Sequence, residues 1–343
     1  SVTYFDALGS LYDKIERLKA HKEILFPLLP LGDSEDLNIA IRYCKIDLVS
    51  SVVFEFPELQ GIMGEYYLKH AQLPVTAAKA VGEHLRHITL GQTISPTGTL
   101  LSLLDRFDNI ISCFILNLKP TSSHDPYALR RQSLEIITLL SSLEFSIDLS
   151  ALFNKLIENF PKELPIGLWD KRAIIEQIIS FIGGRLRTFL TSLGFSKDII
   201  ATVFLESSLH NPIAIIHAAT AIQQFKQDQP EALRNIIETH NRLKKILASL
   251  QLNTIAITHI LGEQPDEIFK SILNQFPELP KNPLPKELFA YLLSLDQLSV
   301  AIQNFLNEVH VACDDEALRS FRISLLVQAL EKFSGYQWEA LHV

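Results

Sequence analysis

Paired histidines and aspartates in the first third of the chain are the side chains best suited to chemistry. His84 and His87 are three residues apart, and so are Asp105 and Asp108. Residues at this spacing share one face of a helix, where imidazole and carboxylate groups can bind a common metal ion. An isolated pair is more often part of a polar helix face or a cap, and the chain has no HExxH motif.

Other catalytic signatures are missing from the sequence. The strings GxSxG, GxGxxG and GxxxxGK[ST] do not occur, so serine-hydrolase, dinucleotide and phosphate-loop sites have no support. Cys44, Cys113 and Cys313 are far apart and form no CxxC pair, which indicates free thiols in a reducing compartment. The His-Asp dipeptide at 124–125 falls where a helix cap is expected. We therefore expect no complete catalytic site in this chain.

Basic residues cluster in three short segments that offer contacts to nucleic acid. Cations three residues apart on a helix can straddle a phosphate or stack on an unpaired base. An ion pair or a solvated helix face is the common alternative, for example between Arg319 and Asp315. The net charge of −8 excludes binding through bulk charge, so any contact must be local. The candidate residues are Arg130, Arg131, Arg242, Lys244, Lys245, Arg319 and Arg322.

The elements that must position these residues are helices almost throughout. Apolar residues recur at three and four along the chain, whereas alternation with period two is nearly absent, which predicts an all-α, multi-helical fold. In the first helix, this period places Lys14 and Arg17 on the polar face. Asp125 is expected to cap a helix with Pro126 in its first turn, and Asp315 lies at another helix start. Further helices are expected within 100–114, 128–140, 174–190, 233–247 and 317–333.

Length and hydropathy limit the class of protein. A chain of 343 residues with 47% hydrophobic content is long enough for about two domains with real cores. No apolar run reaches the roughly 18 residues of a membrane span, and the N-terminal segment is too charged for a signal peptide. We expect a cytoplasmic protein with no membrane contact.

Two sequence strings carry a family resemblance. Residues 54–67 (FEFPELQGIMGEYY) and 125–131 (DPYALRR) resemble the β subunit of bacterial heterotetrameric glycyl-tRNA synthetase. Nearly the whole chain is similar to the C-terminal half of that subunit. Further similar segments, in order, are 8–17 (LGSLYDKIER), 43–49 (YCKIDLV), 104–109 (LDRFDN), 181–187 (FIGGRLR) and 314–326 (DDEALRSFRISLL).

The resemblance implies a layout and a function. Residues 1–190 would form a degenerate HD-like helical domain, 191–230 a helical connector, and 231–343 a DALR-type anticodon-binding bundle. The chain would be part of a glycine–tRNA ligase that binds tRNA-Gly and assembles with the α subunit as α2β2. The α subunit would bind ATP and Mg²⁺ and perform aminoacylation, so this chain would hold no cofactor.

Departures from an active HD site bear on the metal. Lys45-Ile46-Asp47 stands where a His-Asp dipeptide is expected, and Phe5 stands where the family often has His. An ammonium group cannot replace an imidazole ligand, so no catalytic metal is expected. Polar residues that would line the vestigial pocket are Asp47, His70, Asp105 and Asp108. Two further departures from the family lie in the basic segments. Phe321 stands before Arg322 where the family has Asn, and Asn241 stands before Arg242 where the family has a basic residue.

Three functions follow as hypotheses. The first is tRNA recognition for glycyl-tRNA synthetase, in which substitution of Arg322 by Ala weakens tRNA binding and leaves the fold intact. The alternative is an HD-type metal-dependent phosphohydrolase, which predicts a bound divalent metal. A helical scaffold without RNA contact is the third, and it predicts no salt-dependent tRNA binding.

Overall fold

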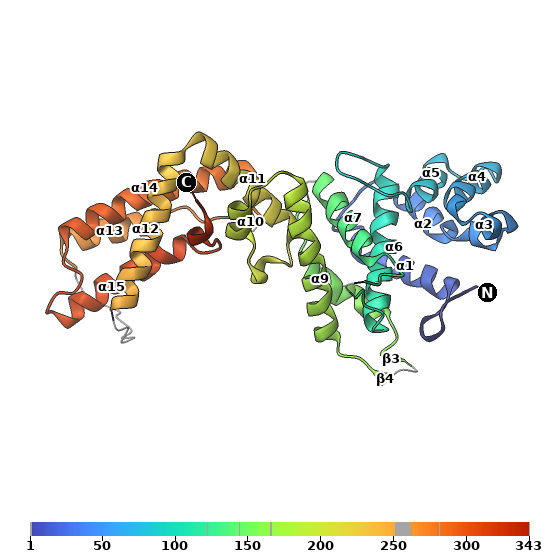
Figure 1. Ribbon diagram of the computed structural model, residues 1–343, viewed down its shortest axis with the longest axis horizontal. Coiled ribbons are helices and arrows are strands. Elements are labelled where there is room, and N and C mark those ends of the chain that lie inside the picture. The colour runs from blue at the N-terminus through green and yellow to red at the C-terminus, as the bar shows by residue number, and fades with distance from the viewer. Residues whose placement is uncertain are drawn as a thin grey trace. The chain divides into compact units, whose positions relative to one another are not determined.

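The computed structural model describes residues 2–121, 123–143, 145–164, 167–250, 262–280 and 282–342. The chain forms two compact units. Unit 1 comprises residues 1–189 with 209–213, and unit 2 comprises 190–208 with 214–343. The all-α prediction is confirmed: helices dominate both units, and the described strands form only two short ribbons (Figure 1). The three-part division at 190 and 230 stays a prediction.

Unit 1 is built mainly from α-helices. They are α1 (Leu11–Leu25), α2 (Ser34–Tyr43), α3 (Ser51–Glu55), α4 (Ile62–His70), α5 (Val75–Glu83), α6 (Pro96–Ile115), α7 (Leu129–Ser142), α8 (Leu149–Leu156) and α9 (Lys171–Ser192). Single 3-10 turns are η1 (Asp6–Leu8), η2 (Ile46–Val49), η3 (Pro57–Leu59) and η4 (Ile157–Asn159). The antiparallel ribbons pair β1 (Thr3–Phe5) with β2 (Gly9–Ser10), and β3 (Glu163–Leu164) with β4 (Gly167–Leu168).

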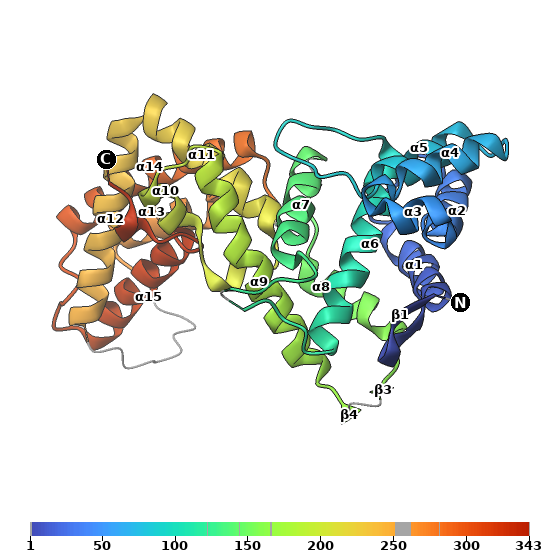
Figure 2. The same ribbon diagram turned by 45° about the vertical axis from the view of Figure 1, so that its right-hand side comes forward.

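Helix α6 is the centre of unit 1. Helices α1, α2, α5 and α7 all pack against it, as Figure 2 shows for the blue and green part of the chain. Ser95 caps its first turn, with Pro96 at the first helical position. Nearly all of its residues are buried, including Asp105, Arg106 and Asp108. Buried charge in a central helix must be matched by partners on its neighbours, because desolvation of an unpaired ion is costly.

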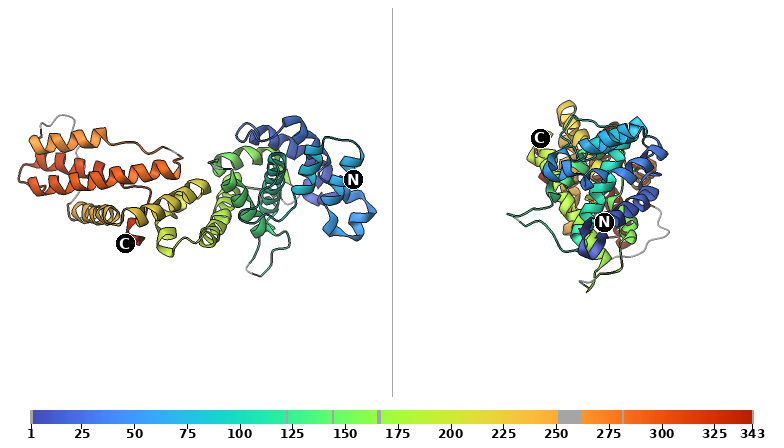
Figure 3. Two further views of the ribbon diagram at one scale, coloured as in Figure 1. Left: turned by 90° about the horizontal axis from the view of Figure 1, so that it is seen from above. Right: turned by 90° about the vertical axis from the view of Figure 1, so that its right-hand side faces the viewer.

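Unit 2 is a helical bundle of α10 (Lys197–Val203), α11 (Pro212–Asp228), α12 (Pro230–Ser249), α13 (Gln264–Gln275), α14 (Pro285–Glu308) and α15 (Glu316–Lys332), with the turns η5 (Glu206–Ser208) and η6 (Trp338–Ala340). Helix α12 packs on α14 and α15, and α13 lies beside both α14 and α15. Figure 3 shows α13 to α15, in orange to red, side by side. The stacked rings of Phe269 and Phe305, with centroids 4.4 Å apart, lie in this core.

The helix starts test two predicted caps. Asp315 lies at the start of α15, as predicted, and is its N-cap, because its carboxylate accepts the Leu318 N–H at 3.0 Å. The predicted start at Pro126 is wrong, because α7 begins at Leu129 after Ala128, which has φ of 52°. Asp125 still caps this helix, because its carboxylate accepts the N–H of Leu129 at 2.8 Å. Among the described residues, no helix is both long and apolar enough to cross a membrane.

Candidate functional site

Five buried charged side chains meet on the face of α6 that packs against α1. We call them the ion cluster: Lys14, Arg17, Lys45, Asp105 and Asp108. The prediction that Lys14 and Arg17 lie on a polar, solvated face is wrong, since both are less than 10% exposed. Their spacing of three residues directs both side chains from α1 toward α6.

Each carboxylate of the cluster is held by two cations. The Nζ of Lys14 lies 3.2 Å from Oδ1 of Asp105 and 2.8 Å from Oδ2 of Asp108. Lys45 completes Asp105, with its Nζ 3.1 Å from Oδ2. Arg17 completes Asp108 through two contacts, Nε to Oδ1 at 2.9 Å and a terminal nitrogen to Oδ2 at 3.2 Å. Lys14 therefore bridges the two aspartates.

The neighbouring imidazole of His84 is fixed by hydrogen bonds on both nitrogens. Its Nδ1 lies 2.7 Å from the carbonyl oxygen of Val81, and its Nε2 lies 3.1 Å from Nζ of Lys45. A carbonyl only accepts and an ammonium only donates, so the ring is neutral with its proton on Nδ1. Burial and the charge of Lys45 lower the pKa of His84 to about 3, which agrees with this tautomer.

The cluster keeps its aspartates ionised. Burial alone would raise the pKa of Asp105, but Lys14 and Lys45 hold it well below its usual range. Asp108 is held low in the same way by Lys14, His21 and Arg17. The two aspartates in turn raise the pKa of Lys14 against the opposing effect of burial. Ammonium and guanidinium groups thus compensate the charge that a metal cation would compensate in a metallohydrolase.

The remaining predicted pocket residues lie outside the cluster. Asp47 is fully buried, but its Oδ2 accepts the N–H groups of Gly61 at 2.6 Å and Gly64 at 3.1 Å and so holds the start of α4. His70 is exposed at the end of α4 and stacks on Tyr66. Of the predicted set, the structure brings together only Asp105 and Asp108. No group of three or more metal-ligating side chains occurs among the described residues.

His87, which is 56% exposed, lies at the edge of a second ion pair formed by the buried side chains of Arg106 and Glu135. Its Nδ1 lies 2.6 Å from Oε1 of Glu135, whose other oxygen accepts Nε of Arg106 at 2.8 Å. Another nitrogen of Arg106 donates to the carbonyl oxygen of His84 at 2.8 Å. His84 and His87 therefore contact different partners, and the shared metal ion considered for this spacing has no geometric basis.

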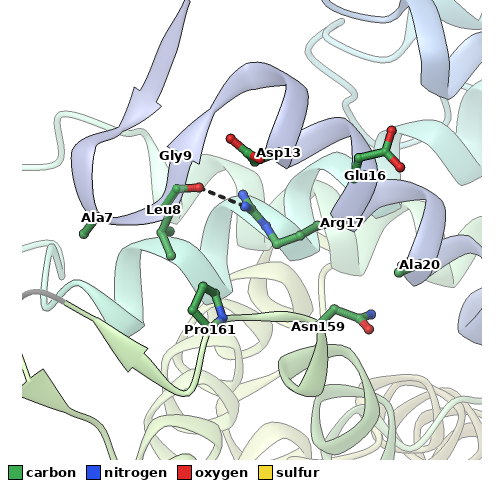
Figure 4. Close-up of a pocket in the computed structure, with 9 residues that line it drawn as sticks. All are labelled: Ala7, Leu8, Gly9, Asp13, Glu16, Arg17, Ala20, Asn159 and Pro161. Atoms are coloured by element: carbon green, nitrogen blue, oxygen red, sulfur yellow. Dashed lines mark hydrogen bonds between the residues drawn. The ribbon is translucent and has the colours of Figure 1, made fainter.

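A surface cavity of about 520 Å³ borders the ion cluster at Arg17, whose guanidinium donates to the carbonyl oxygen of Leu8 (Figure 4). Asp13, on its wall, forms the capping box of α1 with Ser10. Among the described residues that line this cavity, none offers an imidazole or a thiol for catalysis. The lining residues are Ala7, Leu8, Gly9, Asp13, Glu16, Arg17, Ala20, Asn159 and Pro161.

The basic residues of α12 present a different kind of site. Leu233, Ile236, Leu243 and Leu247 bury one face of this helix against the bundle. Arg242, Lys244 and Lys245 are all exposed on its remaining surface. Lys244 pairs with the carboxylate of Glu339, whereas Arg242 and Lys245 have no ion-pair partner among the described residues. Arg242 and Lys245, three residues apart, form a pair of solvated cations on a rigid helix.

The other basic candidates are engaged within the protein. Arg322 is only 3% exposed, and its guanidinium contacts the buried carboxylate of Asp266 at 2.8 Å and the exposed carboxylate of Glu263 at 2.6 Å. Arg319 is half-buried and donates to the carbonyl oxygen of Cys313 at 3.2 Å, not to the carboxylate of Asp315. This geometry gives Arg322 a structural role in joining α13 to α15.

In unit 1, Arg130 and Arg131 differ in their contacts and in their exposure. Arg130 donates to the carbonyl oxygen of Thr121 at 2.5 Å and lies 3.8 Å from the carboxylate of Asp125. Arg131 is exposed. Arg130 therefore braces the loop before α7, and Arg131 is the more exposed member of this pair.

Residues 1–205, more than half of the chain, match the protein family described as "Glycyl-tRNA synthetase beta subunit". The chain belongs to this family. The match includes the ion cluster, Asp47 and the 54–67 string. It stops before α12, so the basic helix lies outside the matched part.

Individual relatives extend the match to the C-terminus. The chain is 57% identical to a glycine–tRNA ligase of Chlamydia pneumoniae over 100% of this chain and 34% of the relative. A glycine–tRNA ligase of Chlamydia muridarum is 52% identical over 99% of this chain and 34% of the relative. The glycine–tRNA ligase beta subunit of Clostridioides difficile is 30% identical over 96% of this chain and 48% of the relative. The chain thus spans between one third and one half of the length of these relatives.

Proposed function

We propose that this chain is the tRNA-recognition portion of a glycyl-tRNA synthetase. In this proposal it binds tRNA-Gly for an aminoacylation reaction whose active site, with ATP and Mg²⁺, lies in the α part of the enzyme. Family membership supports the assignment to a synthetase. The exposed cation pair Arg242 and Lys245 on α12 supports RNA binding, because guanidinium and ammonium groups contact phosphates and unpaired bases.

Unit 2 would bind the anticodon region as a DALR-type bundle. Its helices α12 to α15 form a rigid scaffold, and α12 presents Arg242 and Lys245 from a fixed backbone. Single-stranded loops expose base edges and faces that such side chains can contact. Lys244 has a weaker claim, because tRNA would compete with Glu339 for its ammonium group.

Unit 1 would have a structural role in the synthetase and no hydrolase activity. The HD-like reading of residues 1–190 accounts for the aspartates of the ion cluster, and Lys14 and Lys45 would take over the neutralising role of a metal ion. Arg131 is the candidate tRNA contact in this unit, since its neighbour Arg130 is engaged with Thr121 and Asp125.

The α part of the enzyme would be the main protein partner. Relatives such as that of Clostridioides difficile are named beta subunits, and in an enzyme of that kind a separate α chain would complete the proposed α2β2 assembly. The chlamydial relatives are named glycine–tRNA ligase without a subunit name. They are also longer than the beta subunits, because the match covers 34% of their length and 48% of the length of the Clostridioides difficile protein. Their higher identity favours an enzyme in which α and β parts share one polypeptide. The proposed location is the cytoplasm, where tRNA is charged.

The double substitution Arg242→Gln/Lys245→Gln in the full-length synthetase tests the tRNA site. Loss of two phosphate contacts should weaken tRNA-Gly binding roughly ten-fold and reduce the salt slope of the logarithm of affinity by about two. Glycyl-adenylate formation should be unchanged, since that step needs no tRNA. The readouts are tRNA binding at several salt concentrations and glycine-dependent pyrophosphate exchange.

Arg172→Gln is the matched control, because its side chain is 88% exposed on α9 and pairs only locally with Glu176. This variant should keep wild-type affinity and salt slope. The proposal for α12 is wrong if the double variant binds tRNA-Gly like the control at every salt concentration.

A further inference from the structure

Apolar side chains are unusually exposed between η2 and the start of α5. Phe54 is 81% exposed and Tyr66 60% exposed, and their neighbours on these short elements are similarly open. Single exposed apolar residues are ordinary, but a concentration of them marks an interaction site. We call this set the apolar surface: Val49, Phe54, Phe56, Ile62, Tyr66 and Val75.

The backbone beneath the apolar surface is fixed. Ser50 caps α3, and the carboxylate of Asp47 holds the N–H groups of Gly61 and Gly64 at the start of α4. Gly61 has φ of 84°, a left-handed conformation that favours glycine. The exposed rings therefore stand on a constrained chain, which lowers the entropic cost of binding a partner.

The apolar side chains also form an ordered row on α4. Ile62 and Tyr66 are four residues apart and share one helix face. His70 continues this face, and its ring stacks on that of Tyr66 with an interplanar angle of 7°. A row of this kind fits an apolar protein surface that lies along the helix.

The charged residues near the apolar surface favour a protein partner over RNA. Between Val49 and Val75 the sequence has a single Lys or Arg, Lys69, which pairs with Glu65, while Glu55 and Glu58 are exposed among the apolar residues. Carboxylates repel RNA phosphates, so stacking of tRNA bases on these rings is disfavoured. A second copy of this chain would bring Glu55 and Glu58 against their own kind. A surface with an apolar centre and Lys or Arg at its edge is complementary.

We infer that the apolar surface docks against the remainder of the glycyl-tRNA synthetase, on a patch that is apolar with a basic rim. This inference rests on the proposed function. The chlamydial relative matches this chain over only 34% of its length, so a large protein surface of the same enzyme is available as the occupant. Docking there would remove Phe54 and Tyr66 from water.

Photo-crosslinking in the full-length synthetase tests the docking. Benzoylphenylalanine at position 54 should form crosslinks to peptides outside the region matched by this chain. The same probe at Tyr12, which is 66% exposed on α1 and lies outside the apolar surface, should give none of these crosslinks. Crosslinks to tRNA, to the same segment of a second copy, or to no partner would each overturn the inference.

A second variant measures the contribution of the rings. With the probe at position 62, the substitutions Phe54→Ser and Tyr66→Ser should reduce crosslink yield by about ten-fold, because aromatic anchors dominate interfaces. Both side chains are exposed, so the melting temperature should be unchanged, and Tyr12→Ser should leave the yield unchanged. Undiminished yield in the double variant would contradict the inference. Charging of tRNA-Gly by the wild type, assayed in parallel, reports on the proposed function independently.

Discussion

The Nζ of Lys45 lies 3.1 Å from Oδ2 of Asp105, on the opposite oxygen from Lys14. Asp105 is thus neutralised by two ammonium groups supplied by the chain itself. The same Lys45 donates to Nε2 of His84, the atom through which a histidine could bind a metal. One lysine therefore engages both an oxygen and a nitrogen ligand of the kind that a hydrolase would offer to its metal.

Removal of this ammonium group should be costly. Lys45→Met leaves Asp105 with Lys14 alone in a site that water does not reach, so the free energy of unfolding should fall by about 3–5 kcal/mol. Urea denaturation gives this value. Lys69→Met is the control, since Lys69 is 51% exposed in its pair with Glu65 and should cost less than about 1 kcal/mol. Equal stability of the two variants would show that the cluster contributes little.

His84 should make the protein sensitive to mild acid. Its pKa is about 3 in the folded state, below the value of about 6.5 expected when unfolded. Between these values the unfolded chain binds a proton that the folded chain does not. Stability therefore falls as pH decreases, by up to about 1.4 kcal/mol per pH unit.

The variant His84→Gln should flatten this dependence, because an amide can accept from Lys45 and donate to Val81 without titrating. Asp105 and Asp108 have lowered pKa values, so their contribution is present above pH of about 4 and is lost below it in both proteins. Urea melts from pH 4 to 6.5 thus isolate His84. Parallel curves for variant and wild type would argue against a neutral His84.

Metal analysis separates the proposed function from the phosphohydrolase alternative. We expect the purified protein to hold less than about one-tenth equivalent of manganese, iron or zinc, and its melting temperature to stay constant when these ions are added. The reason is that Lys14 and Lys45 already neutralise the carboxylates of α6. A stoichiometric divalent metal, together with phosphodiester hydrolysis, would restore the alternative.

Substitution of Arg322 should lower the stability of the folded protein. Arg322→Met strands the buried carboxylate of Asp266, and the free energy of unfolding should fall by about 3 kcal/mol. Arg319→Met removes one bond to a carbonyl oxygen and should cost about 1 kcal/mol. Thermal unfolding distinguishes the two. Normal stability with weakened tRNA binding in the Arg322 variant would support the direct tRNA contact expected from the sequence.

Periodicity in the sequence predicts the helices well, because a buried helix face repeats its apolar residues locally. Helices α1, α6, α7, α9, α12 and α15 all lie where that pattern placed them. The start of α7 was misplaced because the turn depends on Ala128 in a left-handed conformation, which its side chain does not favour.

The partners of charged residues could not be predicted in the same way. Lys14 looked solvated because amphipathic patterns assign charge to the outer face, and its acceptor Asp108 is 94 residues away. Arg322 looked free for the same reason, since Asp266 is 56 residues away. Only the fold brings such pairs together. The solvated pair Arg242 and Lys245 remains a predicted tRNA site.

The ion cluster also has a consequence for how unit 1 comes apart. Its cations stand on α1 and before η2, its anions stand on α6, and the contacts join residues 60 to 94 positions apart. Detachment of α1 alone would leave Asp108 without its two cations and Asp105 with Lys45 alone, so partial opening is penalised. We expect amide hydrogens of α1 and α6 to exchange together, at the rate of global unfolding, which makes these helices one cooperative block.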